Sequence, residues 1–157
     1  MNIHKEVKNI INENLKKILK LRNLKKLKKD KSFVSKGDIF IQNILNKFLS
    51  KKFNKNNFIL VSEENYKNIT IDYCKYEDIF ILDPIDGTEN FVSGIPLWGI
   101  SFCWYHKNKH KDSIIYLPEL DLSISKKFRS LKNKSRIIGL SSSNNKLLKS
   151  LNNLNEV

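Results

Sequence analysis

The segment ILDPIDGTENF, residues 81–91, decides the fold assignment, because it ends a hydrophobic run with two acids and follows them at once with Gly-Thr. Asp83 and Asp86 stand three residues apart with a proline between them. Asp-Pro and Asp-Gly both favour turns, so a plain surface turn is one interpretation. The other is a metal and phosphate site, in which the acids bind a cation and Gly87 lets backbone amides approach an anion.

Two segments upstream have the apolar spacing of helices. Residues 1–22 place aliphatic side chains three and four positions apart on one face, and residues 38–49 repeat the pattern. Asp38 at the start of the second segment suits the N-cap or the first turn of a helix. Residues 23–31 between them are basic and polar, and either extend the first helix or form a loop. The first helix is expected to bury Ile3, Val7, Ile10, Ile11, Leu15, Ile18 and Leu19.

Two short apolar runs each end in acids. FILVSEE, residues 58–64, is rich in β-branched and aromatic residues, and DIFILDPIDG, residues 78–87, has the same plan. Both are typical of buried strands that deliver carboxylates to one edge of a sheet. Carboxylates that converge there repel one another unless a cation bridges them, and Mg²⁺ is commonly held by carboxylates and substrate phosphates. Glu63, Asp83 and Asp86 are therefore the candidate ligands.

The chain beyond the motif continues with strand patterns. Residues 97–105 and 112–118 are expected to form a hairpin with its turn near Asn108. RIIGL, residues 136–140, is a further strand candidate, and NNKLLKSLNNL, residues 144–154, is a short helix candidate.

The composition narrows the class of protein. The 157 residues are 40% hydrophobic and 10% aromatic, which predicts a folded chain with a core. No apolar run approaches a membrane span and the first twenty residues do not form a signal peptide, so we expect a cytoplasmic protein without a membrane partner. Cys74 and Cys103 have no paired spacing, so neither a disulfide framework nor a zinc site is predicted.

The net charge of +13 is a weak indication of a nucleic-acid partner. Lysine, asparagine and isoleucine are in excess together, alanine is absent and there are three arginines. This bias is typical of AT-rich codon usage, so the charge does not by itself predict nucleic-acid binding.

The motif DPIDGTENF, preceded twenty residues earlier by the acidic pair of VSEE, resembles the inositol monophosphatase family of Mg²⁺-dependent, lithium-sensitive phosphatases. That family is related to fructose bisphosphatases and bisphosphate nucleotidases. SFVSKGD, GIPLWGISFCWY and SIIYLPELD are similar to further segments of the family, so the resemblance covers most of residues 33–121. It implies an α/β (α+β) fold, a layered α-β sandwich of the sugar phosphatase type, with Mg²⁺ as cofactor and a small phosphorylated substrate.

The resemblance also implies roles for individual residues. Glu63, Asp83 and Asp86 match metal-binding carboxylates, and the Ile85 carbonyl matches a backbone metal ligand. Gly87 and Thr88 match the amides that bind the substrate phosphate. In addition, Asp38 and Thr88 match the catalytic pair that orients and deprotonates a metal-activated water, so that no covalent intermediate is needed.

Other interpretations of these residues stay open. The DxDGT motif of haloacid-dehalogenase-type phosphatases needs two acids two positions apart, and an EF-hand needs acids at positions 1, 3 and 5, so neither spacing fits. Asp38 as a plain N-cap and Thr88 as a capping hydroxyl remain alternatives. Glu64 either supports the site or faces solvent.

Members of the family are longer, and their second half supplies another metal-binding Asp from a Trp-Asp motif that this sequence does not contain. We therefore expect a truncated chain: residues 1–130 form an N-terminal metal-binding α/β domain and residues 131–157 begin a C-terminal domain. Loss of the second half is expected to impair turnover, and the exposed face favours marginal stability, aggregation or association into a homo-oligomer. The alternative functions are a non-catalytic metal-binding or oligomerising fragment and, less favoured, a basic nucleic-acid-binding protein.

Overall fold

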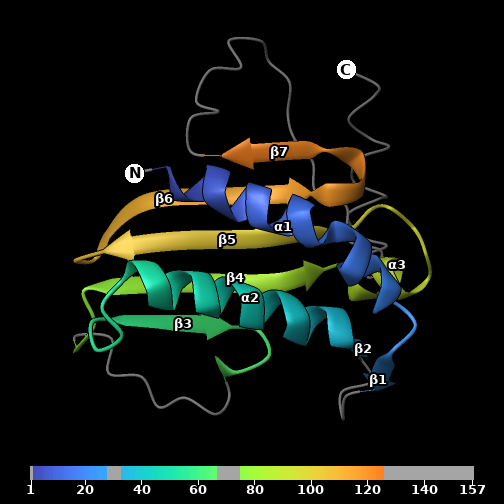
Figure 1. Cartoon of the computed structure of the whole chain (residues 1–157), viewed down its shortest axis with the longest axis horizontal. Coiled ribbons are helices and arrows are strands. Elements are labelled where there is room, and N and C mark those ends of the chain that lie inside the picture. Colours follow the sequence, from blue (N-terminus) through green and yellow to red (C-terminus); the bar gives the residue numbers. More distant parts are fainter. Residues whose placement is uncertain (1, 28–32, 67–74, 126–157) are drawn as a thin grey trace, which may run out of the picture.

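A computed structural model describes residues 2–27, 33–66 and 75–125 of the chain. Helices and strands alternate in the first half, and antiparallel strands follow (Figure 1). In chain order the elements are α1 (Ile3–Lys20), β1 (Lys25–Leu27), β2 (Phe33–Ser35), α2 (Lys36–Lys52), β3 (Phe58–Ser62), β4 (Asp78–Asp86), α3 (Thr88–Val92), β5 (Gly99–His106), β6 (Lys109–Leu117), the 3-10 helix η3 (Pro118–Leu120) and β7 (Leu122–Ser125).

The central sheet has five strands in the order β3-β4-β5-β6-β7. β3 and β4 run parallel, and every later neighbour is antiparallel. The predicted hairpin is confirmed: β5 and β6 pair through a turn at Lys107 and Asn108, whose φ angles of 50° and 60° suit a tight hairpin turn. β1 and β2 form a separate two-stranded ribbon. The mixed α and β architecture agrees with the expected fold class.

Helices α1 and α2 cover one face of the sheet (Figure 1). The predicted apolar face of α1 is confirmed, because Ile3, Val7, Ile11 and Ile18 are fully buried and the other members of that face pack against the core. Beneath the helices the core contains an aromatic cluster, in which Phe80 stacks on Phe102 and on Trp104 and Phe53 contacts Phe80 edge to face.

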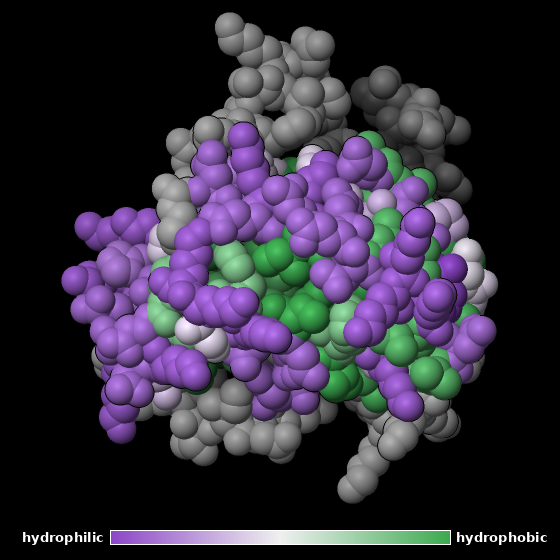
Figure 2. Space-filling view, in the orientation of Figure 1, coloured by the Kyte–Doolittle hydropathy of each residue, from purple (hydrophilic) through white to green (hydrophobic). Residues whose placement is uncertain are grey.

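The two faces of the sheet differ in cover. Phe80 and Leu82 point to the helices and are buried, whereas Ile81 between them is 48% exposed on the other face. Ile115 of β6 is 47% exposed in the same way, between buried Ile114 and Tyr116. On the helix side the surface is largely hydrophilic, with hydrophobic side chains visible near its centre (Figure 2).

Two expectations about the segments before β3 need correction. β1 occupies Lys25–Leu27, where a continued helix or a loop was expected. α2 begins at Lys36, earlier than predicted, and its N-cap is Ser35. Asp38 is the third helical residue, so the plain N-cap interpretation of Asp38 is wrong and the first-turn interpretation is confirmed.

The strand and helix candidates at 136–140 and 144–154, the expected second domain at 131–157, and Cys74 lie outside the described residues. Within the described ranges, no helix is both long and apolar enough to cross a membrane.

Candidate active site

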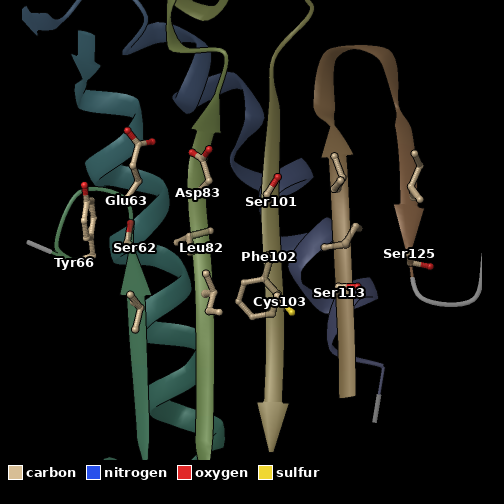
Figure 3. Close-up of a pocket in the computed structure, with 15 residues that line it drawn as sticks. Ser62, Glu63, Tyr66, Leu82, Asp83, Ser101, Phe102, Cys103, Ser113 and Ser125 are labelled. Carbon is tan, nitrogen blue, oxygen red and sulfur yellow. The ribbon is translucent and has the colours of Figure 1, made fainter. Parts of the chain in front are cut away.

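The parallel pairing of β3 with β4 brings Glu63 to Asp83. Ser62 lies opposite Leu82, and the Glu63 amide continues the ladder by donating to the Leu82 carbonyl at 3.1 Å. Glu63 therefore follows the last residue of β3 at the level where Asp83 follows Leu82. Figure 3 shows the two carboxylates side by side, and the charge of Glu63 helps to raise the pKa of Asp83.

A bulge in β4 separates Asp83 from Asp86. Asp83 pairs with Ser101 and Asp86 with Gly99, so three steps along β4 oppose two along β5 and one residue is extra. Pro84 lies in this bulge, where its missing N–H costs the ladder little. The sequence predicted a strand that ends in acids, and β4 extends through both of them to Asp86. The bulge leaves the Asp86 side chain exposed.

Asp83 is electrostatically strained in the protein as it stands. Burial, followed by repulsion from Glu63 and Asp86, raises the pKa of Asp83 from 3.8 to about 7. Its Oδ1 atom is buried and has no hydrogen-bond partner among the described residues. A partly buried carboxylate beside two other acids is favourable only when it is protonated or a cation is bound.

Asp38 is held by the start of α2. The Ser35 amide and the Ser35 hydroxyl both donate to Asp38 Oδ2, at 2.8 and 2.7 Å, while the hydroxyl accepts from the Gly37 and Asp38 amides. Asp38 is fully buried, and its Oδ1 has no hydrogen-bond partner in the described structure. Burial raises the pKa of Asp38 to about 6, the Ser35 hydrogen bonds oppose that rise, and the charge of Glu64 adds to it.

Gly37 places this helix start against the motif. A Cβ at Gly37 would lie 3.0 Å from Ile85 Cδ1 and 3.1 Å from Phe91 Cε1, so only glycine fits without a shift. The close approach brings α2 next to β4 and α3. Asp38 consequently lies near enough to Asp83 for their charges to interact.

Gly87 and Thr88 form the turn that the sequence predicted. Gly87 adopts φ 81°, a left-handed conformation that favours glycine, and it caps the short helix α3 that starts at Thr88. The Thr88 hydroxyl donates to the Ile85 carbonyl at 2.9 Å. In this structure the Thr88 hydroxyl is thus bonded to Ile85, and the Asp38 carboxylate is bonded to Ser35. The two side chains of the predicted catalytic pair therefore have separate hydrogen-bond partners.

α3 is held in place from behind by aromatic and ionic contacts. Phe91 is fully buried and contacts Trp98 edge to face at 4.8 Å. The Arg22 guanidinium lies 5.0 Å from the Phe91 ring and forms an ion pair with Glu119, which also accepts from Trp98 Nε1. Trp98 therefore supports the turn from the core.

The donors present suit a hard cation. Carboxylate and carbonyl oxygens are the ligands that Mg²⁺ prefers, and the unpartnered Asp83 Oδ1 supplies such an oxygen next to Glu63. In residues 2–27, 33–66 and 75–125, no three His, Cys, Asp or Glu side chains lie together as a metal site, although the charge of exposed Asp86 acts on Asp83. Glu63 and Asp83 also line one end of a cavity of about 800 Å³ on the open face of the sheet (Figure 3).

The sequence reasoning missed two residues that organise this site. Ser35 orients Asp38 through a capping box, which the Ser-x-x-Asp spacing of residues 35–38 could have revealed. The side chain of Asn65 forms hydrogen bonds with the end of β3, and no sequence pattern predicts that contact.

Known proteins match both the sequence and the fold. The sequence pattern of the Inositol monophosphatase family matches residues 1–152. The chain is 29% identical over 94 residues to the 3'(2'),5'-bisphosphate nucleotidase CysQ of Haemophilus influenzae, a match that covers 60% of this chain and 34% of CysQ. The crystal structure of extragenic suppressor protein suhB from Bartonella henselae matches at TM-score 0.61 and 27% identity, over 80% of this chain and 46% of that one.

A third match is a crystal structure of an IMPase/NADP phosphatase complexed with Mg²⁺ and phosphate, at TM-score 0.60 and 24% identity, over 77% of this chain and 43% of that one. The match to the first curated relatives spans about a third of their length, 31% and 34%. With the strand-end acids, the Gly-Thr turn and the layered fold in place, the chain belongs to the inositol monophosphatase family.

Proposed function

We propose that this chain acts as a phosphatase that hydrolyses a small phosphomonoester in the presence of Mg²⁺. The observation that carries the proposal is Asp83, a carboxylate with an unpartnered buried oxygen that lies beside Glu63 where β3 and β4 deliver their acids. The family assignment supports a phosphatase, as does the name of the bisphosphate nucleotidase that the chain resembles. The matched fold that was solved with Mg²⁺ and phosphate supports the choice of cation.

The carboxylates of Glu63, Asp83 and Asp86 and the carbonyl of Ile85 would hold the cation. When bound, Mg²⁺ supplies neutralisation of the phosphate charge and acidification of a nearby water. It would also relieve the repulsion that raises the pKa of Asp83. Thr88 would keep the Ile85 carbonyl in its position, because its hydroxyl donates to that oxygen.

Asp38 would act as the general base. Ser35 holds Oδ2 of Asp38, which leaves Oδ1 as the oxygen that accepts a proton from the attacking water. A pKa near 6 suits a base that works near neutral pH. The water oxygen forms a bond to phosphorus as the ester P–O bond breaks, the leaving oxygen takes up a proton from solvent, and the products are an alcohol and inorganic phosphate.

The amides of Gly87 and Thr88 would bind the phosphate. The left-handed conformation of Gly87 turns the chain into α3, and the amides of a first helical turn have no intrahelical partner. We propose sugar or cyclitol phosphates as the substrate class, with histidinol phosphate as a further candidate.

Phosphate release from a panel of these phosphomonoesters, with and without Mg²⁺, tests the proposal. We expect Mg²⁺-dependent release by the full chain and a loss of about 100-fold or more in Asp83→Asn, since a charge that acts in the transition state is removed. Asp121→Asn is the matched control, because Asp121 is an exposed acid paired with Lys8 far along the chain from the motif. It should stay within about twofold of the parent.

Two results would contradict the proposal. One is release that is indifferent to Mg²⁺, and the other is an Asp83→Asn protein as active as the parent.

A further inference from the structure

The short turn after β3 carries two acids with different neighbours. The Glu63 carboxylate lies beside that of Asp83 (Figure 3), and the charge of Glu64 acts on Asp38. The two consecutive side chains act on two separate acids, so their placement depends on the backbone conformation of the turn. Whatever fixes this turn therefore fixes the spacing of the acidic cluster.

Asn65 fixes the turn from the outer edge of the sheet. Its Oδ1 accepts from the Ser62 amide at 2.7 Å, and its Nδ2 donates to the Leu60 carbonyl at 3.2 Å. The backbone N–H of Asn65 also donates to the Ser62 carbonyl, at 3.0 Å. Because β3 is the edge strand of the sheet that the described residues form, the side-chain amide of Asn65 takes the place of a neighbouring strand at residues 60 and 62.

The inner side of the same turn is tied to β4. The Glu63 amide donates to the Leu82 carbonyl at 3.1 Å, one residue before Asp83. The turn is consequently bonded on both sides, by the β4 backbone toward the sheet and by the Asn65 side chain toward the edge. Only the second of these depends on the identity of a side chain.

We propose that Asn65 is a positioning residue for the acidic cluster: by bonding Leu60 and Ser62, it holds the Glu63–Glu64 turn in the conformation that binds the cation. This inference rests on the proposed function, because it assigns Asn65 to the Mg²⁺ site. The Asn65 side chain bonds to β3 and not to the acids, so the role assigned to it is positioning rather than ligation. Groups that orient metal ligands typically change metal affinity about 10–100-fold when they are removed.

Calorimetric titration of the full chain with Mg²⁺ alone tests the inference without relying on activity. We expect Asn65→Ala to weaken Mg²⁺ binding about tenfold, at the lower end of that range, because the β4 contact of Glu63 persists. Asn65→Gln, which keeps the amide but moves it by one methylene, should also weaken binding. It carries the test if the alanine variant does not fold.

Asn14→Ala is the matched control. Asn14 also donates from Nδ2 to a backbone carbonyl, that of Ile10 at 2.8 Å, but it does so on α1, away from the acids. It should leave Mg²⁺ affinity unchanged, and urea unfolding in EDTA records how much stability each variant loses. If Asn65 has only a general structural role, the loss of Mg²⁺ affinity should follow the loss of free energy of unfolding in all three variants. That result would overturn the inference.

The outcomes separate the two proposals. A parent chain that binds Mg²⁺ together with folded Asn65 variants of equal affinity would overturn the role of Asn65 and leave the metal site standing. A folded parent chain that binds no Mg²⁺ would overturn the metal site and, with it, the role of Asn65.

Discussion

The two ends of β4 carry acids in opposite surroundings. At the start of the strand Asp78 is 8% exposed and accepts hydrogen bonds at 2.8 Å from Trp104 Nε1 and at 2.8 Å from His106 Nδ1. Near its end Asp83 lies beside Glu63 and has an oxygen without a partner. Both acids belong to β4. They differ in whether the protein supplies hydrogen-bond donors to the carboxylate.

The difference separates a structural acid from a site acid. The hydrogen bonds that Asp78 accepts from Trp104 and His106 tie β4 to β5, so its carboxylate contributes to stability. The neighbours of Asp83 disfavour its charged form, so its carboxylate costs stability unless a cation is bound. Replacing the two acids should therefore shift the free energy of unfolding in opposite directions.

The largest change in the free energy of unfolding is expected on replacing Asp78, at the start of β4. Asp78→Ala removes the acceptor of two partly buried donors, so the free energy of unfolding should fall by about 2–4 kcal/mol. Urea unfolding measured in EDTA at pH 8 gives this value. A change below about 0.5 kcal/mol would show that Asp78 is not a structural acid.

Asp83→Asn should change stability in the other direction. Without a cation, the variant loses the repulsion from Glu63 and Asp86, and we expect it to be more stable than the parent by about 1–2 kcal/mol at pH 8 in EDTA. The same urea experiment measures it. If the Asp83→Asn protein were less stable than the parent, Asp83 would contribute to stability as Asp78 does, and the two acids would not differ in the way proposed.

This gain should depend on pH. The folded pKa of Asp83, about 7, is higher than the ordinary value of 3.8, so the folded state holds its proton more tightly than the unfolded state. The stability of the parent is then complete below about pH 4 and falls as the pH rises through about 7. The difference between Asp83→Asn and the parent should vanish near pH 4 and reach its full size near pH 8. A difference that is constant over this range would point to a cause other than the charge.

The smallest effect is expected at Ser35. Ser35→Ala removes the hydroxyl that caps α2, with its bonds to the Gly37 and Asp38 amides and to Asp38 Oδ2, at a cost of about 1 kcal/mol; the bond from the backbone amide of residue 35 to Asp38 persists. Ser50→Ala is the control, since Ser50 lies near the other end of the same helix. Thermal unfolding of the two variants compares them, and an equal change in both would mean that the capping box contributes little.

Much of the fold follows from patterns that lie within single segments. The three- and four-residue spacing of Ile3, Val7 and Ile11 predicts α1, and the apolar runs before Glu63 and Asp83 predict β3 and β4. The turn at Asn108 is predicted in the same way. In each case one face or one turn decides the local structure, so no distant contact is required.

The rest depends on contacts between segments. The approach of Glu63 to Asp83 requires the register that sets Ser62 opposite Leu82, and no single segment contains that register. β4 continues through Pro84 because β5 accommodates a bulge there. Asn65 was missed because its bonds to β3 are made by a side chain that could equally face solvent. The hydrogen-bond donors of Asp78 likewise come from the partner strand β5, so the segment that contains Asp78 does not predict them.

The most direct test of the acid end as a cation site is the effect of Mg²⁺ on thermal unfolding at pH 8, for the parent chain and for Asp83→Asn. A ligand that binds only the folded state at 100 times its dissociation constant stabilises by about 2.7 kcal/mol. We predict that saturating Mg²⁺ raises the unfolding temperature of the parent by about 5 °C or more and leaves that of Asp83→Asn within about 1 °C. Equal shifts in the two proteins, or no shift in the parent, would contradict the account.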